Sequence, residues 1–240
     1  MQRHFPPLCG DTGGETMTTR KAVLFDLDGT LLDTIPDIAG ALNRALTLSG
    51  LPTHPVRAFE GFVGGGIREA VVKASPAGTE EAVLERVLTA YHDIYVAHCT
   101  DETDYYPGVR ELLAQLERRG LLLGVLSNKT EATARKIVAH YFPEIQFRCV
   151  FGRAAGRPLK PDPAAAWPAL EALALSPADI IYVGDSGTDM VFAQNVGMLP
   201  VAAPWGYRSR EELAGRGAVA LPESPAALLA WITGGGGNAL

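Results

Sequence analysis

KAVLFDLDGT, residues 21–30, is the stretch that decides the fold. Four apolar residues, 22–25, run without a charge into Asp26, and a short run of this kind is typical of a buried strand in a parallel sheet. Asp28 lies two residues further on, so an extended chain directs both carboxylates the same way. Two such carboxylates repel each other unless a cation or a proton lies between them. The sequence therefore predicts a small anionic pocket for a divalent metal at the tip of this strand.

The rest of the chain alternates between apolar runs of strand length and segments with helical spacing. Further strands are predicted at 121–126, 147–151, 179–183, 199–203 and 218–221. Helices are expected between them, with Gly120 and Gly197 as stops. Strand–helix alternation of this kind predicts an α/β fold, a doubly wound parallel sheet of the Rossmann-like type.

One long segment departs from that alternation. Residues 34–105 contain apolar positions at helical spacing over 35–48, 67–72 and 80–98, and no good strand. We expect an all-helical insert at 34–105 within a discontinuous α/β core domain formed by 20–33 and 106–232. Residues 1–19, rich in Gly, Pro and Thr, are expected to be a disordered extension, and 233–240 a flexible tail.

Composition excludes several classes of protein. The chain is 47% hydrophobic and 20% charged, which is ordinary for a soluble globular protein. A net charge of −6 argues against nucleic acid and anionic membranes as partners. No apolar run approaches the roughly 20 residues that span a bilayer. Cys9, Cys99 and Cys149 are scattered, so we expect a reduced, cytoplasmic protein.

Polar residues follow three of the predicted strands. Besides the first strand, Ser127 and Asn128 follow the second, and Asp185 and Asp189 follow the strand at 179–183. Lys160 lies in a loop that can reach the same edge of the sheet. Ligands bind beyond the carboxyl ends of strands in open α/β sheets, so we expect these side chains to converge there.

The chemistry of this set favours phosphoryl transfer. Aspartate oxygens favour Mg²⁺ over zinc, while Ser127, the backbone amide of Asn128 and Lys160 suit a phosphoryl group. A carboxylate close to both can act as a nucleophile and form an aspartyl-phosphate. The second acid, two residues on, can protonate the leaving oxygen and then take a proton from the hydrolytic water.

Simpler structural roles exist for each residue taken alone. Asp26 and Asp28 are compatible with a turn, Asp185 and Asp189 with the first turn of a helix, and Ser127 with a helix cap. Lys160 alone would be read as a surface lysine. Their joint occurrence at the ends of successive strands favours the functional interpretation.

In this order, the motifs DLDGT, SN, K-P and GDSGTD resemble the four motifs of the haloacid dehalogenase superfamily, over residues 20–232. The resemblance implies that Asp26 is the nucleophile and Asp28 the general acid/base. It implies that Asp26, the Asp28 backbone carbonyl and Asp185 hold Mg²⁺, with Asp189 supporting the metal from outside. Ser127, Asn128 and Lys160 would bind the phosphate, and the helical insert would be the C1 cap.

Local segments suggest a narrower relationship. Haloacid dehalogenases lack the second acid and need no metal, so Asp28 and Asp185 indicate a phosphatase. DTIPDIAGALNRAL, FVGGGIREAV, YPGV, SNK and APWGY resemble bacterial phosphoglycolate phosphatases, although pyrophosphatases share some of them. The implied reaction converts 2-phosphoglycolate and water to glycolate and phosphate. Arg68 is our candidate for binding the substrate carboxylate, with a solvated helix residue as the alternative.

Two other functions remain open on the sequence. The first is the same chemistry on another small phosphate, such as pyrophosphate or a sugar phosphate. The second is a catalytically silent phosphate-binding or interaction module, which would be expected to lack Asp26, Asp28 or a metal acid. A small phosphorylated molecule is the expected partner, and a monomer or homodimer the expected assembly.

Overall fold

The central strand of the protein is β1 (Ala22–Phe25), the strand predicted from the opening motif. In the computed structural model, which describes residues 20–234, all four of its residues are buried. β1 pairs in parallel with β4 (Leu122–Thr130) on one side and with β6 (Ile180–Gly184) on the other. Its carboxyl end therefore lies between the carboxyl ends of two neighbouring strands.

Two edge strands complete a five-stranded parallel sheet. β5 (Phe147–Arg153) pairs with β4, and β7 (Leu199–Ala202) pairs with β6, in the order β5-β4-β1-β6-β7. The predicted α/β doubly wound fold is confirmed. The predicted strand at 218–221 is wrong, because only Ala220 forms an isolated bridge, with Val201. An apolar run of four residues, 218–221, is too short to show whether it forms a strand or a single bridge.

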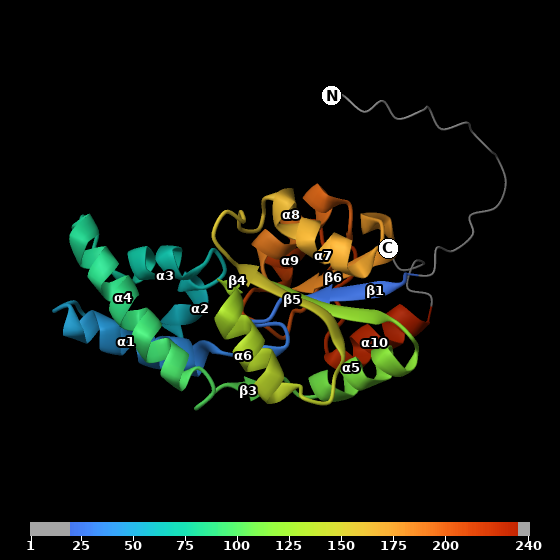
Figure 1. Cartoon of the computed structure of the whole chain (residues 1–240), viewed down its shortest axis with the longest axis horizontal. Helices are drawn as coiled ribbons and strands as arrows, with labels where there is room; N and C mark the ends of the chain where they lie inside the picture. The colour runs from blue at the N-terminus through green and yellow to red at the C-terminus, as the bar shows by residue number, and fades with distance from the viewer. Residues whose placement is uncertain (1–19, 235–240) are drawn as a thin grey trace, which may run out of the picture.

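Helices cover both faces of the sheet (Figure 1). Alternate residues of β1 point to opposite faces. Val23 and Phe25 belong to the apolar cluster with α5 (Val109–Arg118), α6 (Glu131–Tyr141) and α10 (Pro225–Thr233). Ala22 and Leu24 belong to the cluster with α7 (Trp167–Leu173) and α8 (Gly187–Val196). Burial on both faces explains why β1 is apolar throughout.

Short elements fill the connections on the α8 side. Two 3₁₀ turns, Pro163–Ala166 and Pro177–Asp179, each begin at a proline. The helix α9 (Arg210–Gly215) follows β7 and was not predicted, because six residues give too short a periodic pattern.

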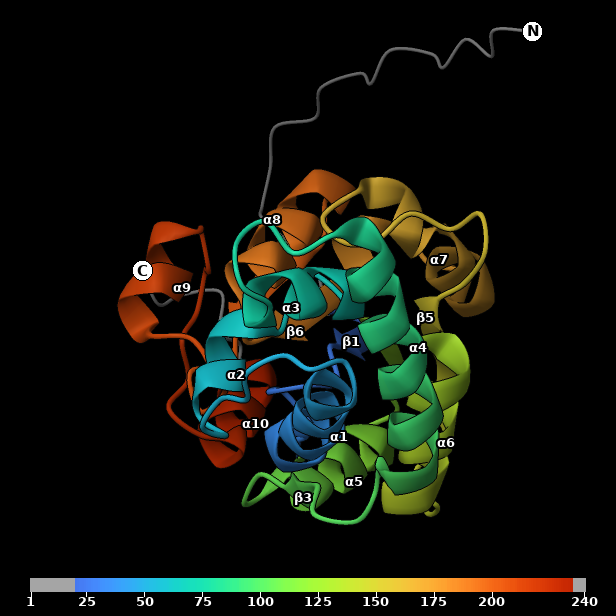
Figure 2. The same cartoon turned by 90° about the vertical axis from the view of Figure 1, so that its left-hand side faces the viewer.

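A separate group of helices lies beyond the carboxyl end of the sheet, on the left in Figure 1 and facing the viewer in Figure 2. It consists of α1 (Ile35–Leu48), α2 (Ala58–Phe62), α3 (Ile67–Ala74) and α4 (Glu81–His98). We call this group the cap. The short α2 was not predicted, and the exact domain boundaries stay a prediction.

Both connections between cap and core run through one short ribbon. β2 (Leu32–Asp33) pairs antiparallel with β3 (Asp104–Tyr105), which the sequence did not predict because two residues carry no periodicity. The buried Asp37 of α1 reinforces this crossing. It accepts hydrogen bonds from the backbone N–H of Glu102 and of Thr103, each at 2.9 Å. The ribbon fixes where the cap is attached to the core.

Within residues 20–234, no helix is long and apolar enough to cross a membrane. The predicted extension 1–19 and residues 235–240 of the predicted tail lie outside the described residues.

Candidate active site

Asp26 stands directly after β1, where the strand ends among the tips of its neighbours. Its N–H donates to Val183 O at 2.9 Å, which continues the pairing with β6. Its Oδ1 accepts from Leu27 N at 2.7 Å and lies 3.1 Å from Lys160 Nζ. The residue is 8% exposed. A backbone donor and an ammonium thus hold one oxygen of a carboxylate that still opens to solvent space.

Asp185 lies beside Asp26, and the turn that contains Gly29 passes close to its carboxylate. Its Oδ2 accepts from Tyr207 N at 2.9 Å. A Cβ on Gly29, whose φ is +79°, would lie 2.2 Å from Asp185 Oδ2. Only glycine leaves the space and adopts this conformation without strain. The glycine of the DLDGT motif is therefore required for Asp185 to lie beside the strand tip.

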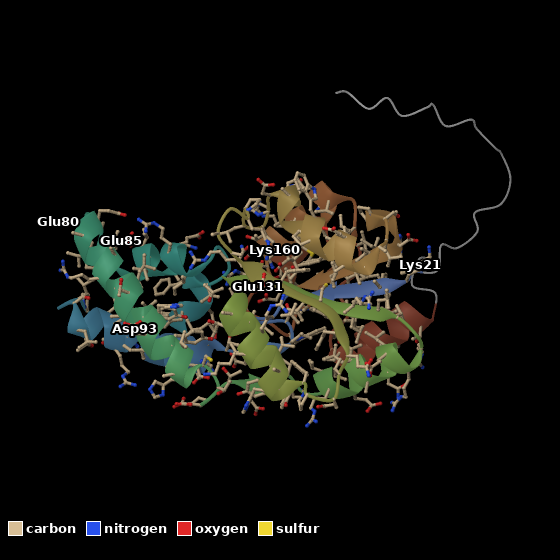
Figure 3. The ribbon with its side chains drawn as sticks, in the orientation of Figure 1. Lys21, Glu80, Glu85, Asp93, Glu131 and Lys160 are labelled. Atoms are coloured by element: carbon tan, nitrogen blue, oxygen red, sulfur yellow. The ribbon has the colours of Figure 1, made fainter. Side chains whose placement is uncertain are left out.

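Lys160 lies at the end of the sheet facing the cap, whereas Lys21 marks the opposite end of β1 (Figure 3). The Lys160 side chain is 2% exposed, and its Nζ donates to Asp189 Oδ1 at 2.7 Å and to Tyr182 Oη at 2.8 Å. Asp189 also accepts from the Ser186 N–H and hydroxyl, which completes a capping box at the start of α8. The carboxylates of Asp189 and Asp26 hold the pKa of Lys160 well above its ordinary value, although burial acts to lower it. The lysine is therefore a fixed positive charge beside Asp26.

Three buried carboxylates form a group that could hold a metal ion. One oxygen each from Asp26, Asp185 and Asp189 lies within 4.8 Å of the others. Burial raises the pKa of Asp26 to about 6, although Lys160 acts in the opposite direction. Burial, together with Asp189 and Asp26, raises the pKa of Asp185 well above its ordinary value. An oxygen-rich group with excess negative charge fits a hard divalent cation such as Mg²⁺.

Asp28 is not a member of that group. Its Oδ1 accepts from Thr34 Oγ1 at 2.7 Å. Lys129 Nζ donates to both of its carboxylate oxygens, at 2.8 and 3.0 Å. Within residues 20–234 the metal-sized group consists of Asp26, Asp185 and Asp189, which leaves the Asp28 side chain for another role.

Ser127 and Asn128 lie inside β4, which continues to Thr130 rather than ending at residue 126 as predicted. Ser127 is buried beside Asp26 and contributes to lowering its pKa. The Asn128 side chain accepts from Lys160 N at 2.8 Å and donates to Lys160 O at 3.1 Å. It also donates to Gly64 O in the cap at 3.1 Å. Asn128 therefore positions Lys160 and contacts the cap.

A second contact between core and cap comes from Arg208. Its guanidinium donates to Glu60 O and, at 2.7 Å, to Val63 O, both in or next to α2. These carbonyls precede Gly64, which has a φ of +128° and begins the triple-glycine turn. That turn lies against the core, where Gly64 O accepts from the Asn128 side chain.

We expect Arg208→Ala to loosen this contact. Hydrogen bonds from a charged donor contribute about 1.5–3 kcal/mol each, so amides of residues 58–66 should exchange with solvent about 10-fold faster or more. Hydrogen exchange followed by mass spectrometry measures this. Arg210→Ala is the matched control, since Arg210 donates to Leu221 O within the core. Unchanged exchange at 58–66 would contradict the assigned role.

A cavity of about 420 Å³ lies between cap and core. The core contributes the polar floor, and the cap contributes mainly apolar and aromatic walls. Its lining includes Asp26, Asp28, Ser127, Asn128, Lys129 and Asp185 from the core, and Ile67, Leu88, Tyr91 and Tyr95 from the cap. The volume falls in the range of about 300–1,000 Å³ that is usual for small-molecule sites.

Arg68 also lines this cavity, from the first turn of α3. Its guanidinium pairs with Glu81 and Glu85 of α4, and the side chain is 51% exposed. Glu85 lies on the face of α4 shown in Figure 3. The proposed contact between Arg68 and substrate stays a prediction, and it would require the arginine to exchange or share these partners.

The comparison with known proteins agrees with this geometry. The family model of haloacid dehalogenase-like hydrolases matches residues 23–203. The chain belongs to this family. A phosphoglycolate phosphatase from Pseudomonas putida is 32% identical over 195 residues, which cover 79% of this chain and 71% of the relative. An N-acetylmuramic acid 6-phosphate phosphatase from Pseudomonas aeruginosa is 31% identical over 192 residues, 80% of this chain and 85% of the relative.

Solved structures have the same fold. One, from Lactobacillus delbrueckii subsp. bulgaricus and assigned as a phosphoglycolate phosphatase, superposes with a TM-score of 0.84 at 29% identity. The match covers 89% of this chain and 98% of that one. Because the chain belongs to this family and its relatives are phosphatases, it is a phosphoric monoester hydrolase.

Two residues that line the cavity, Lys129 and Arg208, are not among those that the sequence predicts for the site. Lysine directly after the Ser-Asn pair was the available signal for the first. Nothing in the sequence indicates that Arg208, 145 residues from Val63, would bind its carbonyl.

Proposed function

We propose that this hydrolase is a Mg²⁺-dependent phosphatase that acts through an aspartyl-phosphate on Asp26, with 2-phosphoglycolate as substrate. The observation that carries the proposal is the position of Asp26. Its carboxylate belongs to a buried group of three acids, touches a fixed ammonium and opens into the cavity. Mg²⁺ at Asp26, Asp185 and the Asp28 carbonyl, supported by Asp189, would neutralise negative charge between nucleophile and phosphate.

The chemistry divides into two displacements. A carboxylate oxygen of Asp26 forms a bond to phosphorus while the bond to the substrate's ester oxygen breaks, and Asp28 gives that oxygen a proton. Water then attacks the phosphorus of the aspartyl-phosphate, Asp28 takes its proton, and phosphate leaves with Asp26 regenerated. Lys160 and Ser127, beside Asp26, are proposed to bind the phosphoryl oxygens.

Support for the substrate comes from the relatives, several of which are phosphoglycolate phosphatases at 31–34% identity. A larger substrate is the second candidate. The cavity of about 420 Å³ exceeds what a two-carbon phosphate fills, and one relative acts on a phosphorylated amino sugar acid. The cytoplasmic location and the monomeric or homodimeric state stay predictions.

The test is kcat/KM for 2-phosphoglycolate, N-acetylmuramic acid 6-phosphate, glucose 1-phosphate and pyrophosphate, with Mg²⁺ and with a chelator. A preference of about 100-fold for 2-phosphoglycolate corresponds to about 2.7 kcal/mol of transition-state discrimination and would support the proposal. A flat profile would remove the named substrate and keep the chemistry. Phosphate release that persists in the chelator would contradict the metal dependence. Absence of phosphate release from all four compounds would favour an untested substrate or the silent module.

Asp28→Asn should lower kcat for 2-phosphoglycolate by about 10²–10⁴-fold, because the alkoxide leaving group then lacks its acid. An aryl phosphate needs that proton far less in the first displacement. With it, the variant should accumulate phosphorylated protein, because the second displacement still lacks its base. Intact-mass spectrometry after acid quenching measures the phosphorylated fraction. If the variant hydrolysed neither 2-phosphoglycolate nor the aryl phosphate and never became phosphorylated, that result would argue against an aspartyl-phosphate.

A further inference from the structure

Among the cations around the cavity, Lys129 is the one next to the proposed acid/base. Arg68, Lys129, Arg153 and Arg208 line the cavity. Arg68 pairs with two glutamates, and Arg208 is bonded to cap carbonyls. Lys129 Nζ lies 2.8 Å from Asp28 Oδ1, and its side chain is 6% exposed. A buried ammonium that faces a ligand cavity contributes much more to binding than one in water.

The short distance between the ester oxygen and the carboxylate of 2-phosphoglycolate would bring the carboxylate close to Lys129. Asp28 must reach the ester oxygen to protonate it. In 2-phosphoglycolate a single CH₂ group separates that oxygen from the carboxylate. Any pose in which Asp28 reaches the ester oxygen therefore brings the carboxylate to the surroundings of Asp28, where Lys129 lies.

Lys129 retains the capacity for a second anionic partner. An ammonium has three N–H donors, and the two described polar contacts of Lys129 go to the oxygens of one carboxylate. Its other flank faces the ring of Tyr95, with Nζ 4.7 Å from the centroid. The buried Tyr95 hydroxyl has no hydrogen-bond partner among the described residues, although Tyr95 lines the cavity. A ligand acceptor beside Lys129 would supply one.

We propose that Lys129 is a specificity residue that binds a carboxylate on the leaving-group side of the substrate. The inference rests on the proposed phosphatase function and extends it to the substrate class, phosphate monoesters with an acidic group close to the ester oxygen. It assigns to Lys129 the recognition that the sequence assigned to Arg68.

A pair of substrates separates recognition from positioning. 2-Phosphoglycolate and 2-hydroxyethyl phosphate differ in whether a carboxylate or a neutral CH₂OH group follows the ester carbon. Lys129→Met should lower kcat/KM for 2-phosphoglycolate about 10- to 100-fold more than for 2-hydroxyethyl phosphate, mainly through KM, because a charge-assisted hydrogen bond is lost. Lys129→Arg should retain most of the preference. Equal losses on both substrates would mean that Lys129 only positions Asp28, and would overturn the proposal.

Further variants test whether another cation binds the substrate carboxylate. Lys136→Met makes the same substitution at a lysine whose Nζ donates to Val96 O and which does not line the cavity, so the preference should be unchanged. Arg68→Ala and Arg153→Met test two other lining cations. Loss of the preference in either, with Lys129→Met neutral, would also overturn the proposal.

A binding measurement keeps the inference separate from the proposed function. Titration calorimetry with Asp26→Asn, with and without Lys129→Met, gives the affinity ratio of the two phosphates without turnover. A ratio that favours 2-phosphoglycolate and falls about 10-fold or more on Lys129→Met supports carboxylate recognition even if the enzyme hydrolyses neither compound. A ratio near one in Asp26→Asn overturns the inference even if both are hydrolysed.

Discussion

Asp26→Asn is expected to lower kcat for every phosphate ester by at least about 10⁴-fold, because the amide cannot form the aspartyl-phosphate. The shape of the side chain is kept, and its Oδ1 can still accept from Leu27 N. The loss should therefore appear in kcat, while binding of a phosphate ester in the presence of Mg²⁺ is retained. Steady-state kinetics and calorimetry on the same preparation measure the two separately.

Asp179→Asn is the matched control for this substitution. Asp179 pairs with Lys21 at 3.1 Å, at the end of the sheet opposite the site. The control should keep wild-type kcat. If Asp26→Asn retained more than about one hundredth of wild-type kcat, Asp26 would not be the nucleophile, and a water molecule activated elsewhere would be the next hypothesis.

Asp185→Asn should have opposite effects on activity and on stability. Activity with Mg²⁺ should fall about 10³-fold or more, because a ligand of the proposed metal is lost and with it several kcal/mol of charge stabilisation. The metal-free protein should become more stable. Burial and the carboxylates of Asp189 and Asp26 raise the pKa of Asp185, so its ionised form destabilises the fold. The amide keeps the bond from Tyr207 N without that charge.

The pH dependence follows from the direction of this shift. In the unfolded chain, Asp185 ionises near pH 4, whereas in the folded metal-free protein it ionises at higher pH. The wild-type fold therefore loses stability as the pH rises above about 4, and the loss is largest at neutral pH. Asp185→Asn should raise Tm at pH 7.5 by about 2–4 °C for each kcal/mol gained, and less at pH 4.

Thermal unfolding in a chelator, with and without added Mg²⁺, measures both properties of this substitution. Wild-type Tm should rise on adding Mg²⁺, since the cation binds only the folded state, and the variant should respond much less. A variant that is less stable than wild type in the chelator would show that Asp185 has a structural role that outweighs its charge.

The sequence predicted the sheet and the acids well because both depend on local patterns. Strands buried on both faces are apolar runs, and the acids follow them directly in the chain. Asp26, Asp185 and Asp189 were expected to converge, and the structure places them within 4.8 Å of one another. The topology of a parallel sheet is sufficient for this, since neighbouring strands share one edge.

Contacts between segments far apart in the chain could not be predicted in the same way. The pairing of Lys129 with Asp28 depends on the register between β4 and β1, and the bond from Arg208 to Val63 depends on how the cap lies on the core. The sequence predicts Arg68 as a ligand of the substrate carboxylate because of its charge. It does not show that α4 places Glu81 and Glu85 beside this arginine, where both pair with it.

The β2–β3 ribbon has a consequence for how the chain tolerates change. Leu32 pairs with Tyr105 and Asp33 with Asp104, so the two ends of the 70-residue segment 34–103 are held side by side. Seen from the core, that segment is one folded insertion whose two ends are joined by the ribbon. We expect insertions and deletions between these ends to leave the sheet in place where they spare the contacts of Thr34, Val63 and Gly64 with the core. The walls that the cap adds to the cavity can therefore change while the core residues of the site, Lys129 among them, stay where they are.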